Sequence, residues 1–273
     1  MDSREHTRKL PAPGPTALGL ATLHLIKRIH RVVVRHGVAG TCGLCTVMLR
    51  HLCVRLLPAL SEASSDGSQH GDAFDRRWGV NTSGNLVPDP AGVVGPNWLH
   101  GARYEGVDPA ALAQVLAGLD IRHDAFTFLD LGSGKGRAVL VAARFPFKKV
   151  LGVEYSTELN AIAQANLSLF PATEKNCTDI ALHCADAAQW PIPDGPLVLF
   201  LFNPFDGEVM SAVAKNLAAS YRAQPRRIFV IYFNAQAHHA WKNAGCLREV
   251  RHSRAYSLFQ ANPHDPQEPE CGC

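Results

Sequence analysis

The chain has 273 residues, of which 47% are apolar and 19% charged, a composition typical of a globular protein with a sizeable core. Its formal net charge of +3 is too small to favour nucleic acid as a partner. The spacing of the eight cysteines does not support a zinc site, because Cys42 and Cys45 lie in an apolar, helix-like stretch, Cys271 and Cys273 lie in the tail, and the others are scattered. We therefore expect free thiols, no metal and a cytoplasmic location.

Residues 1–60 form a basic extension in which Lys and Arg outnumber Asp and Glu. Apolar residues recur at every third or fourth position over residues 18–36, which predicts an amphipathic helix. Such a helix either packs against the rest of the protein or makes peripheral contact with an anionic membrane, and the pattern leaves both open. Charged residues interrupt the apolar stretch 38–60, so it is a poor membrane-spanning candidate. The polar residues 61–71 predict a linker.

The stretch 72–106 is rich in turn-forming residues and precedes a predicted helix. Asp108 and Pro109 have the residue types of an N-cap and a first helical position, so the helix should begin there and run to about Leu119. The turn-rich stretch gathers polar and aromatic side chains, as segments that cover a ligand often do. These side chains are Trp78, Asn81, Thr82, Asn97, His100 and Tyr104.

A short, largely apolar run from Phe126 to Leu131 leads into glycines at alternate positions, and an apolar helical face follows. Such a strand, turn and helix offer backbone N–H groups and a helix N-terminus to a nucleotide-sized ligand. The G-x-G-x-G spacing differs from the dinucleotide fingerprint G-x-G-x-x-G, which disfavours a dehydrogenase, and Gly136 replaces the Ser or Thr of a P-loop. The loop residues are Gly132, Ser133, Gly134, Lys135 and Gly136.

This loop, preceded by an acidic residue, resembles the first motif of the class I, seven-stranded S-adenosylmethionine (SAM)-dependent methyltransferases. The resemblance implies that Asp130 and the loop residues Gly132, Ser133, Gly134 and Gly136 bind SAM. We expect Lys135 and Arg137 to face solvent in the first turn of the helix. The segments 74–84 and 100–104 also resemble a group of uncharacterised bacterial methyltransferase-domain proteins, over roughly residues 72–260. In such proteins the polar stretch before the loop covers the cofactor, so we expect Tyr104 to contact cofactor or acceptor.

Acidic residues end the next two predicted strands. Glu154 ends a strand over residues 149–154, where a carboxylate can accept hydrogen bonds from both ribose hydroxyls. Asp186 follows a third strand that begins near Asp179, and the resemblance implies contact with the adenine amino group. For each residue a plainer alternative stays open, a solvated strand-end acid for Glu154 and an ordinary loop acid for Asp186.

The fourth predicted strand is a nearly continuous apolar run over residues 196–202 that ends in Asn203, Pro204 and Phe205. In the resembled family this strand end holds the reaction centre. Related N-methyltransferases carry two prolines here, and this chain carries one. The resemblance therefore does not imply methylation of adenine or of a glutamine amide, whereas an amine or amide nitrogen remains open as the methyl acceptor. A simple strand-ending turn is the structural alternative. We assign the three residues to positioning the acceptor and identify no general base.

The remaining pattern predicts a helix from Asp206 to about Ala219, a fifth strand over 226–233 and a hairpin from Cys246. Together these elements predict an α/β fold, a Rossmann-like doubly wound seven-stranded sheet, mostly parallel with an antiparallel C-terminal hairpin. A helical N-terminal extension, residues 1–60, precedes the methyltransferase domain, residues 72–262. Residues 263–273 are rich in Pro, Asp and Glu and should lie outside the fold.

Two functions follow from these patterns. The first is a SAM-dependent methyltransferase that acts on a nitrogen of a small molecule or of a protein side chain such as lysine. The second is a SAM-binding or partner-binding protein without catalysis that acts through its basic extension. The polar strand end at Asn203 favours the enzyme, because a protein that only binds SAM needs no acceptor site.

Overall fold

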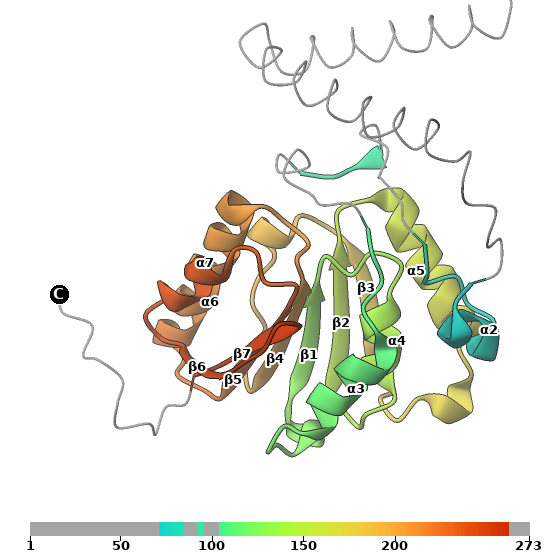
Figure 1. The fold of residues 1–273 in the computed structure, drawn as a ribbon, viewed down its shortest axis with the longest axis horizontal. Coiled ribbons are helices and arrows are strands. Elements are labelled where there is room, and N and C mark those ends of the chain that lie inside the picture. The colour runs from blue at the N-terminus through green and yellow to red at the C-terminus, as the bar shows by residue number, and fades with distance from the viewer. Residues whose placement is uncertain (1–70, 85–91, 96–103, 262–273) are drawn as a thin grey trace, which may run out of the picture. The chain divides into compact units, whose positions relative to one another are not determined.

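A computed structural model describes residues 71–84, 92–95 and 104–261, and its centre is a seven-stranded sheet (Figure 1). The strands lie in the order β3-β2-β1-β4-β5-β7-β6. Their bounds are β1 Thr127–Leu131, β2 Lys149–Glu154, β3 Ile180–Cys184, β4 Leu197–Phe202, β5 Ile228–Phe233, β6 Arg248–His252 and β7 Tyr256–Ala261.

Strands β1 to β5 are parallel, whereas β7 runs antiparallel to both β5 and β6. The predicted doubly wound sheet with a C-terminal antiparallel hairpin is therefore confirmed. The chain moves outward from β1 through β2 to β3 and then returns to place β4 on the other side of β1. At such a reversal the loops leave in opposite directions and open a crevice beyond the carboxyl ends of the strands.

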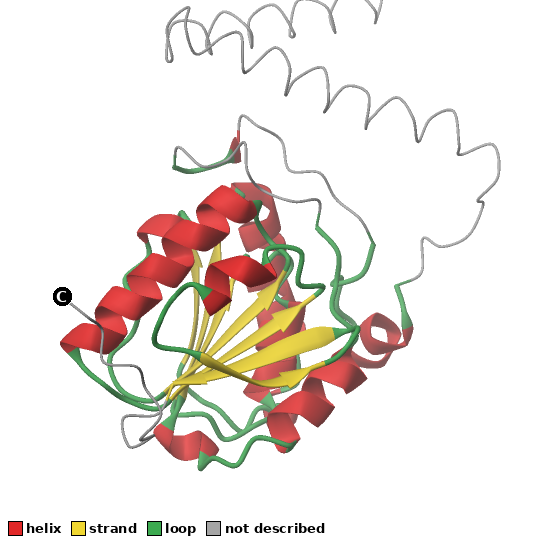
Figure 2. Cartoon of the chain, turned by 60° about the vertical axis from the view of Figure 1, so that its left-hand side comes forward, coloured by secondary structure: helices red, strands yellow, loops and turns green. Residues whose placement is uncertain are grey.

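Helices cover both faces of the sheet (Figure 2). Alternate side chains of the central strands pack into two separate hydrophobic cores, one on each face of the sheet, because successive side chains point to opposite faces. Phe128 and Phe200 pack with α3 and α4, and Leu129 and Leu199 pack with α6 and α7. The helices are α2 Ala73–Trp78, α3 Pro109–Ala117, α4 Arg137–Ala143, α5 Thr157–Leu169, α6 Gly207–Ala223 and α7 His238–Lys242, with short 3-10 helices η4 His123–Ala125, η5 Ala172–Glu174 and η6 Ala187–Gln189.

Most predicted boundaries agree with the structure to within a few residues. Asp108 caps α3 by accepting hydrogen bonds from two backbone N–H groups, and Asp206 caps α6 in the same way. Helix α5 was given no bounds from the sequence, and two further helices were not predicted. One is α2, in the stretch that we interpreted as turns, where Asp72 is the N-cap and Gly79 the left-handed C-cap. The other is α7, whose five residues are too few for a helical period to show.

Several sequence predictions lie outside the described residues. These are the basic extension with its helix at 18–36, the linker, the loop residues Asn97 and His100, and the C-terminal tail. Within the part of the chain that the structure describes, no helix is both long and apolar enough to cross a membrane.

Candidate cofactor and acceptor site

The glycine loop is fixed to the neighbouring strand by its backbone. The N–H groups of Gly132 and Ser133 both donate to the carbonyl of Val153 in β2, at 2.8 and 3.0 Å. Gly132 has φ +84°, and a Cβ there would lie 2.3 Å from the ring of Pro204. Glycine is therefore required at this position both by the backbone conformation and by the close approach of the β4 end.

Tyr104 packs directly on the middle glycine of this loop. A Cβ on Gly134, which has φ +52°, would lie 2.2 Å from the Tyr104 ring. The Tyr104 hydroxyl donates to the carbonyl oxygen of Thr82 at 2.5 Å. The Tyr104 ring thus lies on the glycine loop, while its predicted contact with cofactor or acceptor stays a prediction.

Two buried carboxylates lie under the loop. Glu154 accepts from the N–H groups of Gly134 at 2.8 Å and Ser156 at 2.9 Å, one bond to each carboxylate oxygen. Burial raises the pKa of Glu154 to about 7, against the lowering effect of these backbone hydrogen bonds. Glu154 is 3% exposed, so the alternative of a solvated strand-end acid is wrong. A carboxylate offers about four lone pairs, so acceptor capacity remains for a ligand hydroxyl.

Asp130 differs from Glu154 in having no donor. Its side chain is 2% exposed, and among the described residues none donates a hydrogen bond to its carboxylate. Burial, and to a lesser extent the charge of Glu154, raise the pKa of Asp130 well above its usual range. A buried acid without a donor is costly to the fold. Such a group is a candidate for binding a positively charged ligand group.

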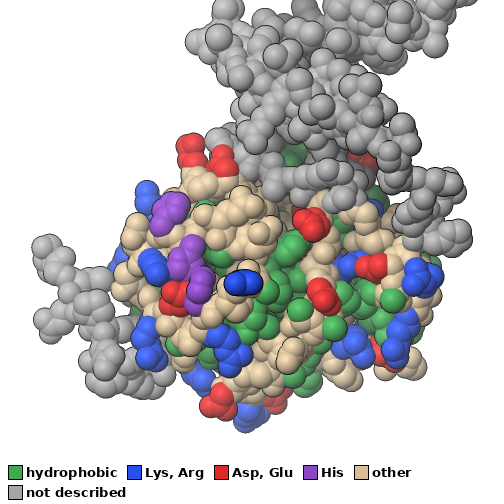
Figure 3. All heavy atoms as spheres, in the orientation of Figure 1, with side chains coloured by type: hydrophobic (Ala, Val, Ile, Leu, Met, Phe, Trp, Pro, Cys, Tyr) green, Lys and Arg blue, Asp and Glu red, His purple; other side chains and the backbone are tan. Residues whose placement is uncertain are grey.

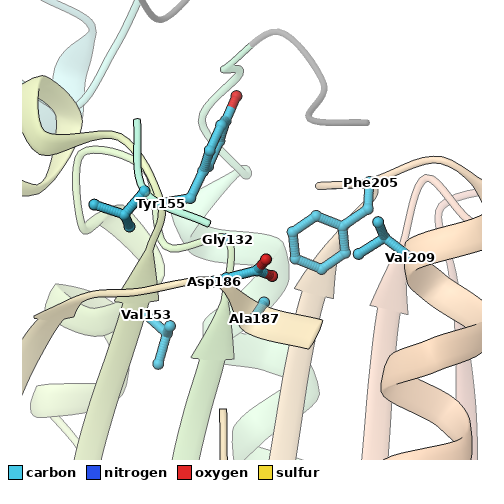
Figure 4. A pocket seen from close by; sticks show the side chains of 8 residues that line it. Gly132, Val153, Tyr155, Asp186, Ala187, Phe205 and Val209 are labelled. Carbon is cyan, nitrogen blue, oxygen red and sulfur yellow. The ribbon is translucent and has the colours of Figure 1, made fainter. Parts of the chain in front are cut away.

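A pocket opens between the glycine loop, η6 and the end of β4 (Figure 4). The Asp186 carboxylate and the Phe205 ring face this cavity. Asp186 also caps η6 by accepting from the N–H of Ala188 at 2.9 Å, and residues 92–95 pack against it. The lining residues are Val94, Gly132, Val153, Tyr155, Asp186, Ala187, Phe205 and Val209. Of these, Tyr155 was missed, although it directly follows Glu154 in the sequence.

The end of β4 is held by a side chain of the next strand. Asn203 has φ +43°, an uncommon conformation for a residue other than glycine. Its Oδ1 accepts a hydrogen bond from the Tyr232 hydroxyl in β5 at 3.1 Å, and that hydroxyl accepts one from the Ala237 N–H at 3.1 Å. Pro204 lies over Gly132, and Phe205 is buried beside the pocket. Pro204 and Phe205 therefore lie beside Gly132 of the glycine loop, whereas the acceptor roles of Asn203, Pro204 and Phe205 stay predictions.

The expectation that Lys135 and Arg137 face solvent is wrong. Both side chains are buried, at 7% and 5% exposure, because residues 72–84 dock on the start of α4. The Lys135 ammonium donates to Asn81 Oδ1 and to the carbonyl of Ser83, at 3.1 and 2.7 Å. Arg137 donates through Nε to Thr82 Oγ1 at 2.8 Å. The two cations thus join the segment before the glycine loop to the helix after it.

Asp75 is the acidic centre of this docked segment. Its carboxylate accepts from the N–H groups of Thr82 and Ser83 at 2.9 and 2.7 Å, and from the Thr82 hydroxyl at 2.5 Å. Arg137 lies 3.5 Å away. Burial acts to raise the pKa of Asp75, but the hydrogen bonds from Ser83 and Thr82 outweigh it and lower the pKa.

A known family matches the same part of the chain. The model of the family described as histone methylation protein DOT1 matches residues 101–177, which include Tyr104, the glycine loop and Glu154. The match covers less than half of the chain, and the strand order β3-β2-β1-β4-β5-β7-β6 extends over the whole described domain. The chain has the class I methyltransferase fold. The family match and this fold support a methyltransferase enzyme with SAM as its cofactor.

Solved methyltransferase structures resemble the chain only remotely. A predicted N6-adenine-specific DNA methylase from Listeria monocytogenes is 13% identical over 57% of this chain and 52% of its own, with a TM-score of 0.44. An RNA methyltransferase from Salinibacter ruber, in complex with S-adenosyl-L-homocysteine, is 16% identical over 60% of this chain and 99% of its own, with a TM-score of 0.42. The chain thus spans about half the length of the first structure. No curated protein sequence matches it.

Proposed function

We propose that the chain binds SAM at the glycine loop and transfers its methyl group to a nitrogen of a protein side chain such as lysine, or of a small amine. The observation that carries the proposal is Asp130, a buried carboxylate at the loop without a donor among the described residues. The ammonium group of SAM supplies the partner that this carboxylate lacks.

The other residues fit the same ligand. The free lone pairs of Glu154 suit the two ribose hydroxyls, and Asp186 at the pocket suits the adenine amino group. Gly132 and Gly134 leave room for close approach to the backbone. These assignments remain part of the proposal.

We assign the positioning of the methyl acceptor to Asn203, Pro204 and Phe205. SAM supplies an activated sulfonium methyl group, so the protein's task is to align the nucleophile for in-line displacement. We assign acceptor contact to the Asn203 carboxamide, held by Tyr232, and apolar packing against the acceptor to Phe205. The description of the matching family as a histone methylation protein supports a protein side chain as one acceptor class. No residue is assigned the role of general base, so proton loss is left to solvent.

Calorimetric titration of SAM and S-adenosylhomocysteine into the full chain, with NAD as a control, tests the cofactor. We expect both SAM ligands to bind and NAD to fail. Methyl transfer from labelled SAM is then compared among lysine-containing peptides, small amines, DNA and RNA. Transfer to peptides or amines supports the proposal, and transfer to nucleic acid alone contradicts the acceptor class. SAM binding without transfer to any acceptor favours the binding protein that lacks catalysis.

A further inference from the structure

Two histidines and a glutamate form a cluster at the α7 and β6 end of the sheet (Figure 3). His238 Nε2 lies 2.8 Å and His252 Nδ1 3.1 Å from Oε1 of Glu249. One ligand-type atom from each residue lies within 4.8 Å of the others. The three residues are separated from the proposed cofactor pocket in sequence and take no part in the proposed methyl transfer.

A β-bulge brings Glu249 and His252 to one face of the edge strand. Residues three apart in a regular strand point to opposite faces. Here the register shifts between Glu249 and Arg251, so Glu249 pairs with Phe259 and His252 pairs with Ser257. Phe259 and Ser257 are two residues apart in β7 and share a face, and their partners therefore share it too. The bulge is what makes a joint site possible.

His238 reaches the same face from α7. Its ring centroid lies 5.3 Å from that of Phe259 and 5.4 Å from that of His252. The side chains of His238 and Glu249 are 23% and 21% exposed, whereas that of His252 is 66% exposed. The cluster is thus held in part by the fold and open on one side to solvent.

We propose that His238, Glu249 and His252 bind one divalent transition-metal ion of the zinc class. Two imidazole nitrogens and one carboxylate are a common ligand set for Zn²⁺, which leaves a fourth position for water. The metal would take the place of the contacts that His238 Nε2 makes with Glu249 and that His252 Nδ1 makes with Glu249 and, at 2.9 Å, with Ser257 Oγ. Neutral imidazoles and an ionised carboxylate are needed for this. The spacing of the cysteines does not bear on this site, because the site contains no thiol.

The positive charge of Lys242 disfavours metal binding at this site, and its removal therefore tests the proposal. Its ammonium lies 3.5 Å from Oε2 of Glu249, the oxygen that neither histidine contacts. The Lys242 side chain is 57% exposed and is free to move into water. Its positive charge nevertheless repels a bound cation. Lys242→Gln should therefore bind the metal several-fold more tightly than the wild type.

A bound metal would tie α7 to the edge strand β6. Helix α7 itself begins next to a contact with the proposed acceptor site. The N–H of Ala237, just before His238, donates to the Tyr232 hydroxyl, which in turn donates to Asn203. The binding itself can be tested without any methyl transfer, so its outcome is separate from that of the proposed enzyme activity.

The test is titration of the full, reduced chain with Zn²⁺ at pH 7.5 by equilibrium dialysis. We expect one metal site that His238→Gln and His252→Gln each weaken by about tenfold or more. His239→Gln is the matched control, since His239 is exposed on the same helix outside the cluster, and it should bind as the wild type does.

Co²⁺ absorption distinguishes this site from the eight cysteines of the chain. Bound Co²⁺ should show weak visible bands without a thiolate charge-transfer band, and His238→Gln should remove them. A spectrum dominated by thiolate bands and unchanged in that variant would overturn the proposal. So would equal Zn²⁺ binding by the wild type and both histidine variants, or no binding by the wild type, which would leave the cluster as an ion-pair network.

Discussion

The proposed cofactor end at β1 and β2 and the proposed acceptor end at β4 and β5 are held by different contacts. At the proposed cofactor end, N–H groups of the loop backbone hold the loop, because Gly132 and Ser133 donate to the Val153 carbonyl and Gly134 donates to the Glu154 carboxylate. At the acceptor end, a side chain fixes the polar group, because the Tyr232 hydroxyl holds Asn203. We therefore expect that the Tyr232 hydroxyl can be removed without disturbing the glycine loop, and the following changes test each end in turn.

The largest effect should come from Asp75→Ala, which removes the acidic centre of the segment 72–84 that docks on the start of α4. The change leaves the N–H groups of Thr82 and Ser83 without this acceptor, and Arg137 loses this partner but keeps its ion pair with Asp72. We expect a loss of about 3 kcal/mol in the free energy of unfolding, measured by urea denaturation.

Asp124→Ala is the control for this change. Asp124 pairs with Arg122 on the surface, where both side chains are largely exposed. We expect little change in stability from its removal. If the two variants lost equal stability, the docked segment would not hold the cofactor end together.

Asp130→Asn should separate ligand binding from stability. Because the Asp130 carboxylate has no donor among the described residues, the amide should keep or raise the melting temperature. Loss of the ionic partner of the SAM ammonium should weaken SAM binding by about 10- to 100-fold, as calorimetry would measure. Asp108→Asn, a change at an exposed helix cap, is the matched control. Undiminished SAM affinity in Asp130→Asn would remove Asp130 from the site.

The pKa of Glu154 predicts opposite effects of pH on binding and on stability. Burial raises this pKa from 4.5 to about 7. Glu154 therefore contributes most to the stability of the SAM-free protein below pH 4.5, and this contribution is lost as the pH rises through about 7. SAM hydroxyls need the ionised carboxylate as acceptor. SAM affinity should therefore rise by about tenfold between pH 5.5 and 7.5.

Calorimetry across this pH range, with Glu154→Gln for comparison, measures the contribution of the carboxyl group. The variant should lose most of the rise in SAM affinity, and its stability should depend less on pH than that of the wild type. An equal rise in both proteins would assign the titration to another group, such as Asp130.

These two ends also differ in how far the sequence predicted them. The strand, glycine loop and strand-end acid are local in sequence, so Asp130 and Glu154 could be placed from spacing alone. The burial of Lys135 could not, because it depends on Asn81 and Ser83, which lie more than 50 residues earlier in the chain. Helix α2 was missed although its caps, Asp72 and Gly79, are visible signals.

At the acceptor end, Asn203 was predicted from its place after a buried strand, but its partner was not. Tyr232 lies in a strand where every residue is buried, so no polar pattern distinguishes it from its apolar neighbours. Likewise, the β-bulge that brings Glu249 and His252 together has no glycine to mark it. Contacts of this kind depend on strand pairing, which a single sequence does not specify residue by residue.

Tyr232→Phe should give the smallest effect and the sharpest test of the separation. The change removes only the hydroxyl that donates to Asn203 and accepts from the Ala237 N–H. We expect the rate of methyl transfer to fall by about 3- to 10-fold, the equivalent of one hydrogen bond, while calorimetry shows unchanged SAM affinity. Tyr256→Phe, which removes a hydroxyl bonded to the exposed Arg251, is the control and should leave both unchanged. A parallel loss of SAM affinity in Tyr232→Phe would mean that the two ends form one unit, because the hydroxyl would then support the cofactor loop as well as Asn203.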